Sequence, residues 1–144
     1  MRFIFCFMFV LTPQLICAQS SGTSAAKSVV GTYREHDRVG AGCTIEVGEP
    51  QGDIVRVQFD CNRGAPSYHH GGGDDRLRLR GGIASDESHN ASGACTIRFA
   101  FDRERVTVTQ RGSDIACGFG AFVNIGGTYP RVSRRQPKFD LLPL

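Results

Sequence analysis

The chain contains Gly40-Ala41-Gly42-Cys43-Thr44-Ile45 and later Ser92-Gly93-Ala94-Cys95-Thr96-Ile97, and these two matching stretches decide its fold. Each continues into alternating apolar and polar residues and reaches a second cysteine, Cys61 in the first case and Cys117 in the second. Four cysteines can pair in three ways. Because each pair brackets one expected hairpin, we predict the disulfides Cys43–Cys61 and Cys95–Cys117 and an internal repeat of two hairpins.

The apolar side chains between residues 28 and 132 recur with a period of two. Val55, Val57 and Phe59 alternate with polar residues, as do Ile97 and Phe99. Strict alternation is typical of antiparallel strands with one buried and one solvated face. No segment shows the periodicity of an amphipathic helix. The expected strands lie near residues 28–35, 43–48, 53–61, 76–82, 94–101, 105–111, 119–125 and 127–132.

A second repeated sequence suggests how the sheet closes. Val30-Gly31-Thr32-Tyr33 begins the expected strands, and Gly126-Gly127-Thr128-Tyr129 stands close to their end. We expect the first and last strands to lie side by side, because closure of a barrel removes exposed sheet edges. The sequence therefore predicts an all-β protein, a small antiparallel barrel of seven to eight strands, with a two-sheet sandwich as the alternative.

The chain divides into a leader, one domain and a tail. Residues 1–18 have one positive charge followed by an apolar run, which is typical of a secretory signal peptide cleaved after Ala18. A lipoprotein acylated at Cys17 is the alternative. The run is too short for a membrane span of about 20 residues. We expect a flexible entry segment at 19–27, a single β domain at 28–132 and a C-terminal tail at 133–144, in a periplasmic or secreted protein.

The expected loop between residues 62 and 75 is the longest irregular segment, and long loops in compact domains are often functional. It offers a group of side chains suited to a partner: Arg63, Ser67, Tyr68, His69 and His70. Tyr68 supplies an aromatic contact, and the two histidines supply titratable donors. The alternative is a solvated hairpin tip with no partner.

Chemistry at a metal or a catalytic centre is not indicated. His69, His70, Asp74 and Asp75 could be interpreted as a metal cluster, but adjacent residues of an extended chain point in different directions. The chain has no HExxH and no Gly-x-Ser-x-Gly motif. Disulfide pairing accounts for the four cysteines better than a nucleophile does. We expect no enzyme activity, no cofactor and no metal.

Arginines dominate the positive charge and could form a basic face. The chain has 17 basic and 14 acidic residues, a balance that does not favour nucleic-acid binding. If their strands are neighbours, the outward arginines form a stripe for an acidic protein, a lipid phosphate or an anionic glycan. The alternative is a solvated face with acids interleaved. The arginines concerned are Arg56, Arg76, Arg78, Arg80 and Arg98.

Three further features of the chain belong together: the leader, the two Cys-Thr-Ile stretches, and an ending in which Cys117-Gly118-Phe119-Gly120 is followed by Val123, Gly127 and Tyr129. In these features the chain resembles small exported bacterial envelope proteins of the lysozyme-inhibitor-like kind. It covers mainly residues 95–131. The resemblance implies a disulfide-stabilised, barrel-like protein that places loop side chains among the catalytic carboxylates of a lysozyme. The 62–75 loop is the segment suited to that role.

These expectations lead to one hypothesis with two alternatives. The hypothesis is a non-enzymatic periplasmic or secreted binding protein that inhibits a cell-wall hydrolase by inserting a loop into its active-site cleft. The first alternative is a module that binds an envelope component or a small ligand through the arginine-rich face. The second is an immunity protein against a secreted toxin. Each requires no nucleic acid and no membrane span.

Overall fold

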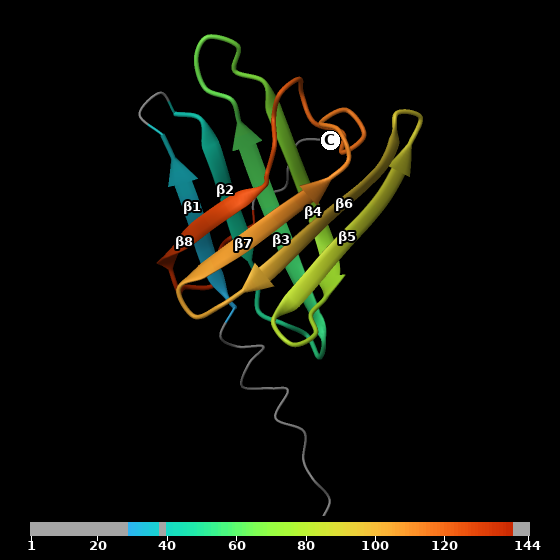
Figure 1. Ribbon diagram of the computed structural model, residues 1–144. Helices are drawn as coiled ribbons and strands as arrows, with labels where there is room; N and C mark the ends of the chain where they lie inside the picture. The colour runs from blue at the N-terminus through green and yellow to red at the C-terminus, as the bar shows by residue number, and fades with distance from the viewer. Residues whose placement is uncertain (1–28, 38–39, 140–144) are drawn as a thin grey trace, which may run out of the picture.

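Eight antiparallel strands form a nearly closed barrel in the computed structural model, which describes residues 29–37 and 40–139 (Figure 1). The predicted signal peptide, its cleavage site at Ala18, the acylation alternative at Cys17 and the predicted entry segment 19–27 lie outside the described residues. The strands are β1 (Gly31–His36), β2 (Gly42–Val47), β3 (Ile54–Asn62), β4 (His70–Arg78), β5 (Ile83–Asn90), β6 (Gly93–Phe101), β7 (Arg105–Arg111) and β8 (Gly127–Ser133).

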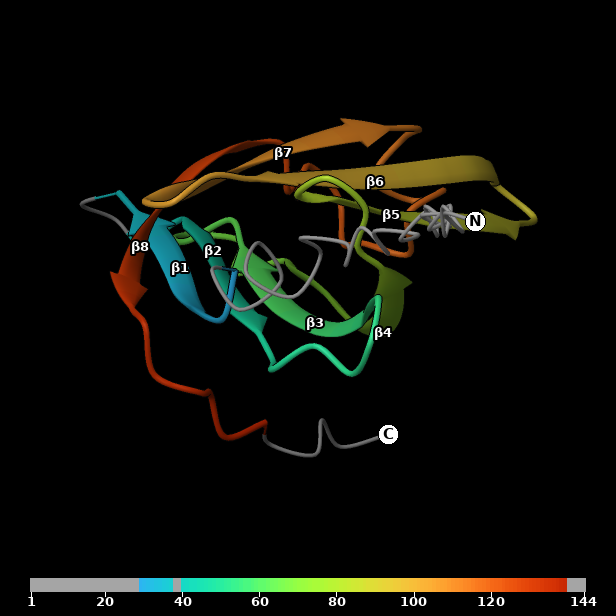
Figure 2. The same ribbon diagram turned by 90° about the horizontal axis from the view of Figure 1, so that it is seen from below.

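The strand order is β4-β3-β2-β1-β8-β7-β6-β5, so strands that are consecutive in the sequence pair with each other, with the exception of β4 and β5. At this seam a single bridge joins Arg80 to Ile83 in the connecting turn. In addition β1 pairs with β8, which confirms the predicted contact of the first and last strands. Figure 2 shows β5, β6 and β7 lying across the molecule from β1–β4.

The core is made by the inward side of every strand, as the period of two requires. Register partners share a face, so the buried pairs Val47 with Val57 and Phe99 with Val108 lie on the inside. Aromatic rings fill the middle of the barrel. The ring of Phe59 lies 6.1 Å from that of Phe99 and 5.9 Å from that of Phe119, which comes from the segment between β7 and β8.

The repeated Gly-Thr-Tyr sequences play the same part on β1 and β8. Tyr33 donates its hydroxyl proton to the carbonyl oxygen of Val29 at 2.8 Å, and Tyr129 donates to that of Ile125 at 2.7 Å. Each tyrosine is buried and bonds four residues back along its own chain. Tyr33 also accepts a hydrogen bond of 2.6 Å from Arg131 on β8. The hydroxyl of Tyr33 therefore ties the two halves of the barrel together where β1 meets β8.

Strand β4 begins earlier than expected, so the segment 62–75 is a loop only from residue 63 to residue 69. Two glycines of this stretch, Gly71 and Gly73, lie against aromatic rings. A Cβ atom at Gly71 would come within 2.6 Å of the Phe119 ring, and one at Gly73 within 2.7 Å of the Phe59 ring. Rings that cover glycines on a strand replace the missing side-chain packing. Glycine is needed here because an aromatic side chain from elsewhere occupies the space.

Two other expectations about strands are wrong. Strand β5 was not expected, because it is an edge strand on which Ala84 is the one buried residue, so its sequence does not alternate. The predicted strand at 119–125 is a series of turns. Positive φ angles of 73° at Gly118 and 63° at Phe122 prevent an extended chain there.

Carboxylates line the seam between the two edge strands. Asp75 on β4 pairs in register with the buried Val57, and Asp86 on β5 pairs with the buried Ile97, so both carboxylates lie on the inner face. Burial raises the pKa of Asp75, and the charges of Asp86 and Asp74 raise it further. An inward charge on an edge strand opposes the addition of another strand.

Tyr33→Phe should destabilise the protein more than Tyr129→Phe. The first substitution removes the donor to Val29 and the acceptor for Arg131, with an expected cost of about 1–3 kcal/mol. The second removes one hydrogen bond, with an expected cost of about 0.5–1.5 kcal/mol. Urea denaturation of the unreduced proteins measures both. An equal loss for the two variants would contradict the role given to Tyr33.

Asp75→Asn should stabilise the protein at neutral pH but not at pH 3. The raised pKa means that the folded state binds this proton more tightly than the unfolded state, so stability falls as the pH rises through the pKa of Asp75.

The neighbouring Asp74 should behave in the opposite way. Its hydrogen bond to Arg56 lowers its pKa, so Asp74→Asn should destabilise at neutral pH, and the loss should disappear in acid. Free energies of unfolding at pH 7 and pH 3 distinguish the two signs.

Candidate binding site at the open end of the barrel

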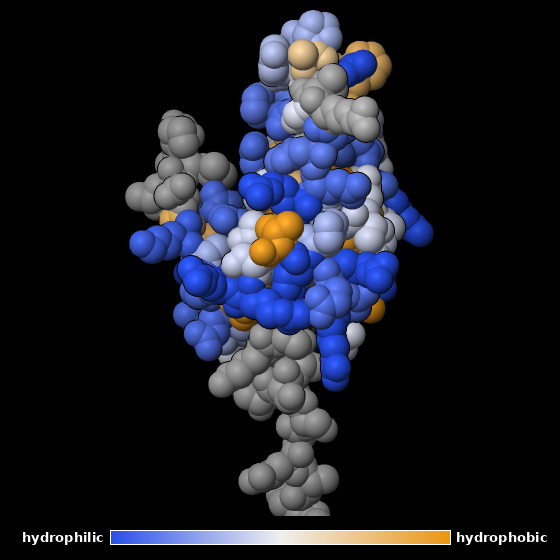
Figure 3. All heavy atoms as spheres, turned by 90° about the vertical axis from the view of Figure 1, so that its left-hand side faces the viewer, coloured by the Kyte–Doolittle hydropathy of each residue, from blue (hydrophilic) through white to orange (hydrophobic). Residues whose placement is uncertain are grey.

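The loop between β3 and β4, the turn between β5 and β6 and the segment between β7 and β8 all lie at the upper end of the barrel in Figure 1. We call this end of the molecule the open end. Figure 3 shows apolar side chains beside hydrophilic ones at this end, above a wall that is mostly hydrophilic. A group of exposed apolar side chains on a hydrophilic molecule indicates a surface for a partner.

The β3–β4 loop is closed by its own backbone hydrogen bonds. The amide of Arg63 donates to the carbonyl oxygen of His69 at 3.0 Å, and the amide of Tyr68 donates to that of Gly64 at 2.9 Å. The side chain of Asn62 accepts a further bond of 2.9 Å from the amide of Gly64. The loop is therefore a set of tight turns that hold Tyr68 at the tip.

The segment between β7 and β8 is organised by one carboxylate. The side chain of Asp114 accepts hydrogen bonds from the amides of Phe122 and Ile115, and these bonds lower its pKa. The carbonyl oxygen of Asp114 accepts a bond of 2.8 Å from the amide of Phe119. Phe119 is thereby directed into the core, whereas Phe122 is directed into solvent.

These two segments are bonded to each other. Nδ1 of His69 lies 2.8 Å from the carbonyl oxygen of Ala121, and the amide of Gly120 donates to the carbonyl oxygen of His70 at 2.7 Å. The guanidinium carbon of Arg63 lies 4.5 Å from the centre of the Phe122 ring, which is cation–π distance. The structure therefore brings Arg63 and His69 of the β3–β4 loop against the segment that carries Phe122, and Tyr68 lies in the same loop.

Tyr68 and Phe122 are exposed aromatic side chains on unusual backbone. Tyr68 is 63% exposed with a φ of 49°, and Phe122 is 76% exposed with a φ of 63°. They are the two non-glycine residues of positive φ in the part of the chain that the structure describes. Such conformations are rare for bulky residues, cost about 1–3 kcal/mol each and cluster at functional sites. We call Arg63, Tyr68 and Phe122 the aromatic tip.

A cavity of about 430 Å³ opens beside the aromatic tip, between the ends of β1 and β2 and residues 122–129. Its lining includes Arg63 and Phe122 together with Glu35 and Asp37. Tyr129 lies in the same wall, and burial together with the charge of Glu35 raises its pKa to about 12. The cavity is large enough to receive a side chain from a partner, with carboxylates to meet a cation.

Both disulfides lie at the open end, and both predicted pairings are confirmed. Cys43 and Cys61 face each other across β2 and β3, with Cα atoms 4.1 Å apart. Cys95 on β6 is joined to Cys117, which lies in the β7–β8 segment rather than on a strand, so the two expected hairpin repeats differ here. Two disulfides indicate an oxidising, extracytoplasmic environment.

The other predicted contact residues lie beside the aromatic tip. Ser67 is exposed in the same loop. His70 begins β4, and its Nδ1 lies 3.6 Å from the carboxylate of Asp60. His69 and His70 thus have different neighbours. In the described residues no three His, Cys, Asp or Glu side chains form a group that could bind a metal ion.

Phe122 is not among the contact residues expected from the sequence. Its neighbour Phe119 turns inward, and the ring of Phe119 lies over Gly71. The conformation of Phe122 depends on Asp114, eight residues earlier in the same segment, whose carboxylate accepts a hydrogen bond from the amide of Phe122.

The predicted arginine stripe is divided between two walls. Arg56 and Arg76 are register partners on β3 and β4, and Arg78 follows on β4. Arg98 lies on β6, and β5 separates it from the unpaired seam. Arg80 belongs to the β4–β5 turn. Acids neutralise part of the β3–β4 group, since Arg56 pairs with Asp74, and Arg78 pairs with Asp53 at 3.0 Å.

Comparisons of the chain with protein families, with curated proteins and with solved structures give no match. Within residues 29–37 and 40–139, no helix has the length and apolar character needed to cross a bilayer.

Removal of the Cys95–Cys117 bridge should loosen the open end. Cys95→Ala with Cys117→Ala should cost about 3 kcal/mol, as expected for a loop of this size, and should speed hydrogen exchange at the amide of Gly120, which faces β4. Cys43→Ala with Cys61→Ala is the matched control. It should lower the free energy of unfolding by a similar amount, but hydrogen exchange at the amide of Gly120 should be slower than in the Cys95→Ala, Cys117→Ala variant.

Peptide mapping of the unreduced protein tests the pairing itself, and a Cys43–Cys117 peptide would contradict it.

Proposed function

We propose that this protein is a non-enzymatic binding protein that inhibits a cell-wall hydrolase of the lysozyme type, with the aromatic tip entering the active-site cleft. In this proposal residues 1–18 are a signal peptide that directs the chain to the periplasm or the cell exterior, in keeping with the two disulfides. The observation that carries the proposal is the contact of Arg63 with the exposed Phe122 ring, in a loop that also carries the exposed Tyr68.

The chemistry of the aromatic tip complements such a cleft. Glycoside hydrolases place two carboxyl groups on either side of the scissile bond. Arg63 forms no ion pair with another described residue, so its guanidinium is available to carboxylates. Exposed aromatic and arginine side chains dominate the binding energy of many protein interfaces.

The rigidity of the open end supports the same proposal. A loop that is ordered before binding loses less conformational entropy when the complex forms. The hydrogen bonds of the β3–β4 loop, the bonds of Asp114 and the two disulfides all act on the segments that carry Tyr68 and Phe122. The positive φ angles are maintained by these contacts rather than by a preference of the residues.

The test is inhibition of a panel of lysozymes and peptidoglycan hydrolases by the unreduced protein. Tyr68→Ala and Phe122→Ala should each cost about 2 kcal/mol of binding or more, a rise of roughly thirtyfold in the inhibition constant. Arg63→Gln should have a similar effect on any hydrolase with two catalytic carboxylates.

Two controls separate binding from folding. Val132→Ala removes an exposed apolar side chain from β8, and Arg98→Gln removes an exposed arginine from β6, and neither should change inhibition. Circular dichroism and thermal unfolding show whether each variant is folded. Full inhibition by folded tip variants would contradict the site, and a wild-type protein that inhibits no hydrolase in the panel would contradict the choice of target.

A further inference from the structure

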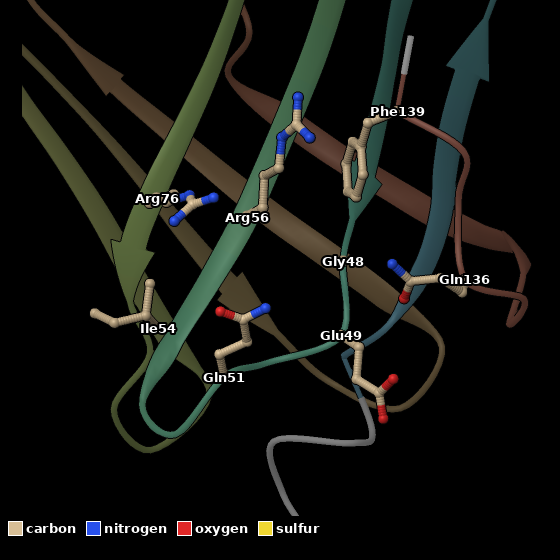
Figure 4. A pocket seen from close by; sticks show the side chains of 8 residues that line it. All are labelled: Gly48, Glu49, Gln51, Ile54, Arg56, Arg76, Gln136 and Phe139. Atoms are coloured by element: carbon tan, nitrogen blue, oxygen red, sulfur yellow. The ribbon is translucent and has the colours of Figure 1, made fainter. Parts of the chain in front are cut away.

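A second pocket lies on the outer wall of the barrel, at the end of β2 and β3 opposite to the aromatic tip (Figure 4). We call it the outer-wall pocket. It has a volume of about 230 Å³, and the side chains that matter for its chemistry are Gln51, Ile54, Arg56, Arg76, Gln136 and Phe139. They come from the β2–β3 turn, β3, β4 and the segment after β8.

The segment after β8 forms one wall of the outer-wall pocket. Phe139 packs on Gly48, where a Cβ atom would come within 2.9 Å of the ring. The guanidinium carbon of Arg56 lies 4.3 Å from the centre of the same ring. The predicted tail is therefore docked as far as Phe139, and the glycine at position 48 makes this close approach possible.

Arg56 and Arg76 differ in their partners although they face each other in the register of β3 and β4. Arg56 donates from Nε to Asp74 at 2.7 Å and forms a second short contact with the same carboxylate, which lowers the pKa of Asp74. Arg76 influences Asp74 electrostatically but forms no ion pair or hydrogen bond with another described residue. Its guanidinium therefore has donors to offer to a ligand.

The rest of the lining is polar and mixed. Figure 4 shows the guanidinium of Arg76 directed toward Arg56, with the amide of Gln51 between Ile54 and the β2–β3 turn. The carboxylate of Glu49 points away from Arg76 in the same view. Ligand sites commonly combine apolar surface with a few placed polar groups, and the outer-wall pocket has this composition.

We propose that the outer-wall pocket binds a sugar acid, a single pyranose ring that carries a carboxylate. Arg76 pairs with the carboxylate, which a guanidinium can bind through two parallel hydrogen bonds. The amides of Gln51 and Gln136 bond ring hydroxyls, and Ile54 with Phe139 covers the apolar side of the ring. The volume of about 230 Å³ is below the range of about 300–1,000 Å³ typical of drug-sized ligands and suits one ring.

The lining suits a sugar acid better than a simpler ligand. An inorganic anion would use Arg76 but leave both glutamines and the apolar surface without contacts. A neutral sugar would leave Arg76 without a partner. This site is distinct from the aromatic tip and does not depend on the inhibition of a hydrolase.

The experiment is a nuclear magnetic resonance titration of the unreduced protein with sodium glucuronate, with glucose and sodium acetate in parallel. Saturable shifts of the side-chain amides of Gln51 and Gln136 and of Nε of Arg76 are expected with glucuronate, at concentrations where glucose and acetate give none. Arg76→Gln should weaken glucuronate binding on the order of tenfold or more, as expected for loss of a charge-assisted hydrogen bond.

Arg78→Gln is the matched control, because Arg78 follows on the same strand, pairs with Asp53 and does not line the pocket. It should bind glucuronate like the wild type, and so should Tyr68→Ala, which alters only the aromatic tip. No saturable shift in the wild type overturns the proposal. Equal shifts with acetate overturn the sugar part, and equal losses in Arg76→Gln and Arg78→Gln overturn the assignment to this pocket.

Discussion

The pairing of β1 with β8 is the constraint on which the barrel depends. Each half, β1–β4 and β5–β8, is a chain of hairpins, and the edges of β4 and β5 separate beyond the Arg80–Ile83 bridge. The register of β1 with β8 is short, since Thr32 pairs with Ser133 and Tyr33 with Arg131 across an irregularity. Tyr33 compensates for the short ladder. Its hydroxyl donates a hydrogen bond to the carbonyl oxygen of Val29 and accepts one from Arg131, and its ring contacts that of Phe101 on β6. Side chains rather than a long ladder join the two halves.

Much of the fold could be predicted because local sequence patterns specify most of its strands. Alternation located β2, β3, β6 and β7, and the repeated Gly-Thr-Tyr located the closure between β1 and β8. Strand β5 could not be located in this way, because an edge strand with one buried residue needs no apolar alternation. The first residues of β4 fall in the loop expected at 62–75. The rings that replace the side chains of Gly71 and Gly73 come from Phe119 and Phe59, and a contact so distant in sequence leaves no local pattern.

The sequence predicts one of the two segments that form the candidate site. The loop that carries Arg63 and Tyr68 stood out by its composition, but its partner Phe122 depends on the hydrogen bonds of Asp114 and on the contact of His69 with Ala121. The contact of His69 with Ala121 links two segments whose proximity only the fold determines. The same limit applies to the arginines, since alternation shows that they point outward but not which walls they share. The outer-wall pocket needs Phe139 docked on β3, which no periodicity predicts.

The position of the two disulfides affects what proteolytic cleavage does to the protein. Each bridge spans a turn at the far end of the barrel: Cys43–Cys61 spans the exposed β2–β3 turn at residues 51–53, and Cys95–Cys117 spans the β6–β7 turn at residues 102–104. Exposed turns are where a protease cuts first. A cut in either turn leaves the two pieces covalently joined at the end that carries the aromatic tip. Cleavage of one peptide bond in either turn therefore does not separate the segments that carry the aromatic tip from the rest of the protein.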